Sequence, residues 1–202
     1  MKKIVVENMM NLIKNNGQYS DEKLAEIKYG LEGLYLTFSK LIVIFLLAYL
    51  LGVIKEVLIF LIIYNVIRTT SFGLHATKSW ICLLSSTVIF IGFPLLCKYL
   101  VISNDFKLII GLILILFIYK NAPADTYKRP IVSKNRRLFF KYSSTFIAIS
   151  FIYCSILISN NFLSNCFLLS LLIQSLMISP TIYKMFNLPY NNYITYLANN
   201  NI

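Results

Sequence analysis

The stretch that decides the fold class is residues 142–183, YSSTFIAISFIYCSILISNNFLSNCFLLSLLIQSLMISPTIY, in which no residue carries a charge. About 20 consecutive apolar residues form a helix long enough to cross a lipid bilayer, so this stretch has room for two crossings and the turn between them. The composition of the whole chain agrees. Of its 202 residues, 58% are hydrophobic and 13% are charged, against roughly 45–50% and 25% in soluble domains. These values exclude a soluble enzyme, a coiled coil and a disordered chain, and they predict an all-α polytopic membrane protein.

Apolar runs in the rest of the chain raise the number of predicted transmembrane helices to six. We place them near residues 36–54, 56–72, 79–97, 105–121, 142–159 and 165–183. With the N-terminus in the cytoplasm, 16 of the 19 Lys and Arg residues lie on the cytoplasmic side, and only Lys55, Lys98 and Lys107 lie outside. Because an excess of basic residues marks the cytoplasmic side, we expect a multi-pass cell-membrane protein with both termini in the cytoplasm. The same bias accounts for the net charge of +11, so we expect no nucleic acid partner.

The chain is expected to have three parts. The first, residues 1–35, is a cytoplasmic or interfacial helical region, in which Ser20 followed by Asp21 and Glu22 is typical of a helix start. After this start, apolar residues repeat at the spacing of an amphipathic helix, at Leu24, Ile27, Leu31 and Leu34. Residues 36–183 form the six-helix membrane domain, and residues 184–202 form a cytoplasmic C-terminal tail.

Two of the predicted crossings contain short apolar runs, residues 57–67 and 108–119. At 1.5 Å per residue the first run is about 16 Å long, whereas the hydrocarbon core is roughly 30 Å thick. To span the membrane, these helices must carry Arg68 and Lys120 into it. Ionisable groups at such depth face the protein interior or extend to the lipid headgroups. We expect Lys120 to reach the headgroups and Arg68 to face the interior, because of the residues that follow Arg68.

Residues 68–82, RTTSFGLHATKSWIC, contain the only histidine of the chain, His75, and Cys82 seven positions later. In one straight helix these two residues would be about 10.5 Å apart along the axis, so a catalytic pair requires a break in the helix. Gly73 and small polar residues interrupt the apolar run here. Ser79 is a candidate N-cap that puts Cys82 in the first turn of the next helix, and Thr77 is the other candidate. The positive end of that helix and a nearby imidazole favour the thiolate form that a cysteine nucleophile needs.

A purely structural role for these residues is also compatible with the pattern. A lone cysteine in an apolar helix is usually a small buried side chain, and a histidine at a membrane boundary can be an ordinary polar interface residue. We assign structural roles to the other cysteines, Cys97, Cys154 and Cys166, which lie deep in apolar runs or on the outer side. Because no cysteines are paired in a ligand motif and there is no second histidine, we expect no metal and no cofactor.

The segment from Arg68 through Gly73-Leu74-His75-Ala76 to Cys82 resembles the signature of the accessory gene regulator B (AgrB) family of Gram-positive bacteria. So does the sequence Ala122-Pro123-Ala124-Asp125-Thr126, followed by Lys128-Arg129-Pro130-Ile131. The resemblance covers almost the whole chain. It implies a homodimeric membrane cysteine endopeptidase of quorum sensing, which cuts a short propeptide of the AgrD type through an acyl-enzyme thioester and promotes closure of a thiolactone ring. It further implies that Cys82 is the nucleophile, that His75 is its general base, and that Arg68 and Gly73 hold positions important for activity.

Three further residues are candidates for supporting roles. Asp125 is the one acid between residues 120 and 141, and it either orients the imidazole or makes a local turn after Pro123. Lys128 and Arg129 belong to a basic run that either attracts an acidic peptide segment or only reflects membrane topology and anionic lipid. Two other functions remain open, a small membrane transporter that exports a peptide without cleaving it and a noncatalytic scaffold. The chain has no internal repeat of the kind that many transporters show.

Overall fold

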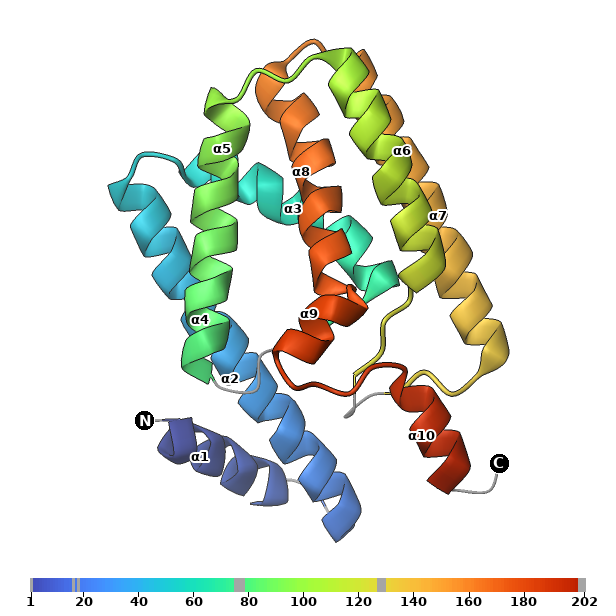
Figure 1. Ribbon diagram of the computed structural model, residues 1–202. Coiled ribbons are helices and arrows are strands. Elements are labelled where there is room, and N and C mark those ends of the chain that lie inside the picture. The colour runs from blue at the N-terminus through green and yellow to red at the C-terminus, as the bar shows by residue number, and fades with distance from the viewer. Residues whose placement is uncertain (1, 16, 18, 75–78, 127–129, 200–202) are drawn as a thin grey trace. The chain divides into compact units, whose positions relative to one another are not determined.

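The computed structural model describes residues 2–15, 17, 19–74, 79–126 and 130–199 (Figure 1). Within these residues the chain forms α-helices and one π-helical turn, and no strand, which confirms the all-α prediction. The contacts divide the chain into two units, residues 1–51 and 52–202. Each unit has its own internal packing.

The first unit consists of α1 (Lys2–Asn15) and α2 (Asp21–Leu50), which pack against each other. Ser20 is the N-cap of α2, and its Oγ accepts a hydrogen bond from the backbone N–H of Lys23 at 3.4 Å. The helix start predicted at Ser20 is therefore confirmed. Because α2 continues without a break beyond residue 35, the amphipathic segment and the first predicted crossing belong to one helix.

The second unit is a bundle built around α8 (Asn161–Met177). The helices that contact α8 are α3 (Ile54–Ser71), α5 (Phe93–Tyr99), α6 (Asn104–Asn121) and α7 (Lys134–Leu157). Most residues of α8 are buried, and its apolar side chains form the core together with Phe60 and Ile67 of α3, Ile118 of α6 and Ala148 of α7. The remaining elements of the unit are α4 (Ser79–Thr87), the π-helical turn Val88–Gly92 that joins α4 to α5, α9 (Pro180–Met185) and α10 (Asn192–Asn199).

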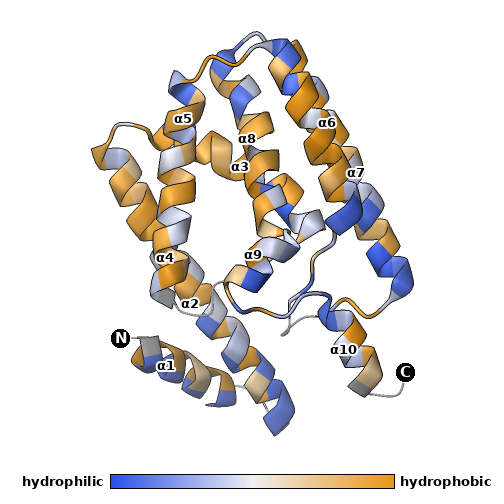
Figure 2. Ribbon diagram, in the orientation of Figure 1, coloured by the Kyte–Doolittle hydropathy of each residue, from blue (hydrophilic) through white to orange (hydrophobic). Residues whose placement is uncertain are grey.

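In the part of the chain that the structure describes, three helical segments are long and apolar enough to cross a membrane, Asp21–Leu50, Trp80–Tyr99 and Lys134–Leu157, while α8 is a shorter apolar helix. Figure 2 shows apolar residues along most of α5, α6 and α8. Large apolar side chains are also exposed on the bundle surface, as at Leu116 and Phe146, where a bilayer would cover them. These features identify a membrane protein. Since α3 and α6 each carry three charged residues in 18, the total of six crossings stays a prediction.

The end of the last predicted crossing, residues 165–183, differs from the expectation. The apolar helix α8 ends at Met177, and a new helix, α9, begins at Pro180. Proline has no backbone N–H and a fixed φ, which suits the first position of a helix but not its interior. Beyond it, the segment expected to be a C-terminal tail contains α10 and contacts the rest of the bundle.

Candidate functional site

Residues 72–74, which follow α3, are fixed by backbone hydrogen bonds to two segments that are distant in sequence. The N–H of Gly73 donates to the carbonyl of Ala124 in the loop between α6 and α7, at 2.8 Å. The N–H of Leu74 donates to the carbonyl of Met177 at the end of α8, at 3.0 Å. The chain that leads to His75 is therefore held between the α6–α7 loop and α8.

Arg68 strengthens this arrangement from the last turn of α3. Its guanidinium donates from Nη1 to the carbonyl of Phe72 at 2.6 Å and from Nη2 to the carbonyl of Leu74 at 2.8 Å, with a longer contact to the carbonyl of Gly73 at 3.5 Å. Gln174 of α8 donates from Nε2 to the same Phe72 carbonyl at 2.7 Å. Hydrogen bonds from a charged donor are about twice as strong as neutral ones. Arg68 thus faces the protein interior, as expected, and binds the backbone of its own chain.

Gly73 is required by the backbone geometry and by lack of space. Its φ is +114°, a conformation that residues with a side chain rarely adopt. A Cβ at this position would lie 2.6 Å from Nη1 of Arg68 and 2.7 Å from the carbonyl oxygen of Met177. Both neighbours belong to the hydrogen-bond network described above, so a larger residue would displace that network.

Helix α3 ends at Ser71, and residues 72–74 are not helical, so the chain leaves the helix before it reaches position 75. Helix α4 is described over Ser79–Thr87, and residues 75–78 lie outside the described residues, so the break between His75 and Cys82 stays a prediction. Cys82 is half-buried and is the fourth residue of α4 as described, and its position near the positive end of the helix stays a prediction. Ser79 is the first described residue of α4, and its capping role stays a prediction. His75 lies outside the described residues, and its distance to Cys82 stays a prediction.

The side chain of Asp125, in the loop between α6 and α7, is buried and has four partners among the described residues. Its Oδ1 accepts from the N–H of Asn192 at 3.1 Å, and its Oδ2 accepts from the N–H groups of Tyr193 at 3.0 Å and Ile131 at 3.2 Å. Nη1 of Arg137 lies 3.4 Å from Oδ2. The carboxylate therefore joins the loop to α7 and to the start of α10. This connecting role was not predicted from the sequence.

Further contacts hold the C-terminal segment on the same loop. The guanidinium carbon of Arg137 lies 3.5 Å from the ring centroid of Tyr193, and the Tyr190 hydroxyl donates to the carbonyl of Asn121 at 3.4 Å. Burial raises the pKa of Tyr190 above its ordinary value, so its hydroxyl remains a proton donor at neutral pH. Residues 190–193 are thus a packed part of the bundle.

The structure leaves some predicted site residues untested and shows others that the sequence did not suggest. Lys128 and Arg129 lie outside the described residues. Gln174 was missed, although an amide inside the uncharged run 142–183 is an unusual residue that signals a buried hydrogen bond. Asn192 and Tyr193 carried no such signal, because their contacts with Asp125 depend on segments more than 60 residues apart.

Comparison with known proteins agrees with the motifs. The chain matches the family model for accessory gene regulator B over residues 6–178. A putative AgrB-like protein of Clostridium acetobutylicum is 36% identical over 57% of this chain, and the matched part is 55% of that relative. Accessory gene regulator protein B of Staphylococcus intermedius is 31% identical over 74% of this chain and 80% of its own length. A putative AgrB-like protein of Listeria monocytogenes is 26% identical over 94% of both chains.

No solved structure matches this chain. The family model, however, covers far more than half of the sequence, including Arg68, Gly73, Cys82 and Asp125. The chain therefore belongs to the accessory gene regulator B family.

Proposed function

We propose that this chain is a membrane-embedded cysteine endopeptidase that processes a short AgrD-type propeptide in quorum sensing. Membership of the AgrB family points to processing of this propeptide. The observation that supports the cysteine chemistry is the end of α3 at Ser71 followed by the non-helical residues 72–74, with Cys82 near the start of α4 as described. The free N–H groups and positive end of a helix favour a thiolate at this position.

In the proposed reaction, His75 accepts the proton of the Cys82 thiol, and the thiolate attacks a propeptide carbonyl. The bond from this carbonyl to the next nitrogen breaks. The C-terminal fragment leaves as an amine with the proton from His75, and a thioester to Cys82 remains. A cysteine of the bound propeptide then attacks the thioester. This exchange releases Cys82 and closes the thiolactone ring, and it conserves the activated acyl bond that hydrolysis would destroy.

Contacts of the described residues next to the proposed reacting groups support this reaction. Arg68 and Gly73 fix the backbone immediately before His75, through the contacts to residues 72–74. The backbone N–H groups at the start of α4 are the candidate donors to the oxyanion. A pocket of about 510 Å³ lies beside Phe72, lined also by residues 130–133, Arg136 and Phe140. Its mixed apolar and basic lining suits a peptide segment that approaches the site.

The rest of the proposal follows the family and the charge pattern. The chain crosses the membrane six times with both termini in the cytoplasm, acts as a homodimer and needs no cofactor. Ser79 and Asp125 support the site, and Lys128 and Arg129 attract an acidic part of the propeptide.

The direct test is to co-express the chain with its cognate propeptide and to compare the wild type with Cys82→Ser and His75→Ala. Both variants are expected to accumulate in the membrane at the wild-type level while cleavage falls by about a thousandfold or more. Cys154→Ser is the matched control, because Cys154 is also half-buried in an apolar helix and has no proposed role.

A second measurement separates the enzyme from the other two functions. A propeptide whose internal cysteine is replaced by alanine cannot resolve the thioester by ring closure, so mass spectrometry is expected to detect an acyl adduct on Cys82. Equal cleavage by the wild type and Cys82→Ser contradicts the proposal. Export of uncut peptide identifies a transporter, and neither cleavage nor export identifies a scaffold.

A further inference from the structure

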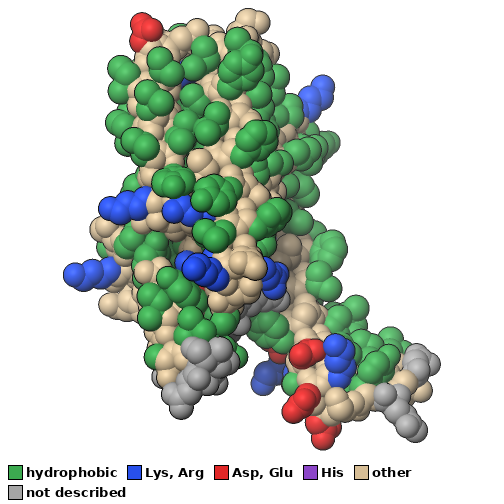
Figure 3. All heavy atoms as spheres, turned by 90° about the vertical axis from the view of Figure 1, so that its right-hand side faces the viewer, with side chains coloured by type: hydrophobic (Ala, Val, Ile, Leu, Met, Phe, Trp, Pro, Cys, Tyr) green, Lys and Arg blue, Asp and Glu red, His purple; other side chains and the backbone are tan. Residues whose placement is uncertain are grey.

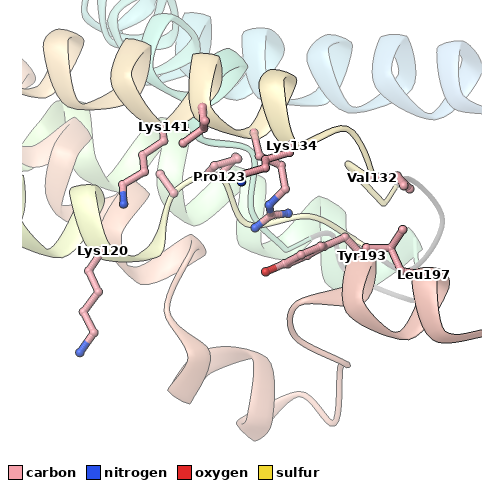
Figure 4. A pocket seen from close by; sticks show the side chains of 10 residues that line it. Lys120, Pro123, Val132, Lys134, Lys141, Tyr193 and Leu197 are labelled. Carbon is pink, nitrogen blue, oxygen red and sulfur yellow. The ribbon is translucent and has the colours of Figure 1, made fainter. Parts of the chain in front are cut away.

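We propose that the pocket at the junction of α6, α7 and α10 binds the headgroup of an anionic phospholipid. The pocket has a volume of about 470 Å³. Its basic side chains are Lys120 at the end of α6, and Lys134, Arg137 and Lys141 in the first turns of α7. Lys120 and Lys141 lie on one side of the pocket, and Tyr193 and Leu197 of α10 lie on the other (Figure 4).

The positive charge of this pocket is largely uncompensated. Among the described residues that line it, none is acidic. Arg137 pairs with Asp125, but within the described part of the chain Lys120, Lys134 and Lys141 form no ion pair. Like charges gathered in one pocket repel each other. A bound anion attracts each of them and so offsets this repulsion.

The surroundings of the pocket indicate a lipid as the source of the anion. The outer faces of α6 and α7 expose large apolar side chains that lead toward the pocket, among them Ile113, Leu116, Phe139 and Phe146. Figure 3 shows this face, with hydrophobic side chains over its upper part and Lys and Arg side chains in a band below them. A phospholipid has the same arrangement of an apolar part followed by a charged group, because its acyl chains end at a charged phosphate.

Tyrosine side chains mark the same boundary. The ammonium of Lys141 lies 4.1 Å from the ring centroid of Tyr119, and the exposed Tyr142 follows Lys141 on α7. Tyrosine is enriched where the hydrocarbon region meets the headgroups. An acidic peptide could use the basic side chains but would not account for the apolar surface that continues from them. The observations therefore favour the lipid over the peptide.

The test measures lipid binding and does not depend on peptide cleavage. The full chain is purified in a neutral detergent, and phosphatidylglycerol or phosphatidylcholine with identical acyl chains is added. Bound lipid is measured by native mass spectrometry, and the midpoint of thermal unfolding is recorded in parallel. We expect phosphatidylglycerol to bind at least about tenfold more tightly than phosphatidylcholine. It should therefore raise the midpoint temperature of unfolding more than phosphatidylcholine does.

The double variant Lys120→Gln/Lys141→Gln is expected to weaken phosphatidylglycerol binding about 25-fold. Each lysine near an anionic lipid raises the binding constant about fivefold, and the two factors multiply. The control variant Lys14→Gln/Lys184→Gln changes the net charge equally but alters exposed lysines outside the pocket, and it is expected to bind like the wild type. Unfolding without added lipid shows whether each variant is folded. Equal binding of the two lipids, or an equal loss in the control, overturns the proposal. Displacement of phosphatidylglycerol by soluble decaglutamate also overturns it, and identifies a peptide site.

Discussion

Gly73 combines a positive φ with a close approach of two neighbours, so its replacement tests the geometry before His75. We expect Gly73→Ala to destabilise the folded state by about 1–3 kcal/mol, because the backbone is strained and the new Cβ meets Arg68 and Met177. Propeptide cleavage should fall about a hundredfold, since small displacements of reacting groups are costly. Unfolding in detergent and the cleavage assay measure the two effects.

Gly33→Ala is the matched control. Gly33 lies inside α2, and a Cβ there would have no neighbour within 4 Å. Alanine is favoured over glycine in a helix by about 1 kcal/mol, so this variant should be as stable as the wild type or slightly more stable. Equal stability of the two alanine variants contradicts the structural role of Gly73.

Arg68 donates to separate carbonyls through two nitrogens of its planar guanidinium. Lysine keeps the charge but has a single nitrogen, so Arg68→Lys cannot hold both carbonyls in the same way. We expect a loss of cleavage of about 10- to 100-fold with normal membrane insertion. Wild-type cleavage by Arg68→Lys would show that only the charge of Arg68 matters.

At the level of helices and loops, Asp125 is the residue that joins the α6–α7 loop to α7 and α10. Asp125→Asn removes the charge that accepts hydrogen bonds from three backbone N–H groups and pairs with Arg137. We expect a destabilisation of about 2–3 kcal/mol and faster proteolysis of the C-terminal segment. Asp105→Asn, at an exposed position in the first turn of α6, should cost about 0.5 kcal/mol. Loss of cleavage with unchanged stability in Asp125→Asn would instead support a direct contact with His75.

The helices and the interruption after α3 were predictable from the sequence because they depend on neighbouring residues. The Ser20 start and the interruption around Gly73 are local signals, and both are present in the structure. The partners of Arg68 and Asp125 were not predictable, because they are set by how α8 and the C-terminal segment pack. The end of the last apolar helix was also predicted too far along the chain. Apolar composition continues past Met177 into α9, although α8 itself ends at Met177.

For the whole molecule, we predict six crossings, of which α3 and α6 are the two that carry three charged residues within 18. Alkaline phosphatase folds only outside the cytoplasm because it needs disulfides. Fusions made after Gly52, Ser103 or Asn160 should therefore be active, and fusions after Ser133 or Asn187 should be inactive. A green fluorescent protein series at the same positions supplies the opposite readout. Phosphatase activity after Ser133 would show that α6 does not cross the membrane.

We propose that the interruption of the helix after α3 brings His75 to Cys82 and makes its thiol reactive. The most direct measurement is the rate at which iodoacetamide alkylates Cys82 at neutral pH, determined by peptide mass spectrometry with Cys154 as the internal reference. We expect Cys82 to react at least about tenfold faster than Cys154, and His75→Ala to remove this advantage without changing the rate at Cys154. Equal alkylation of Cys82 in the wild type and in His75→Ala would contradict it.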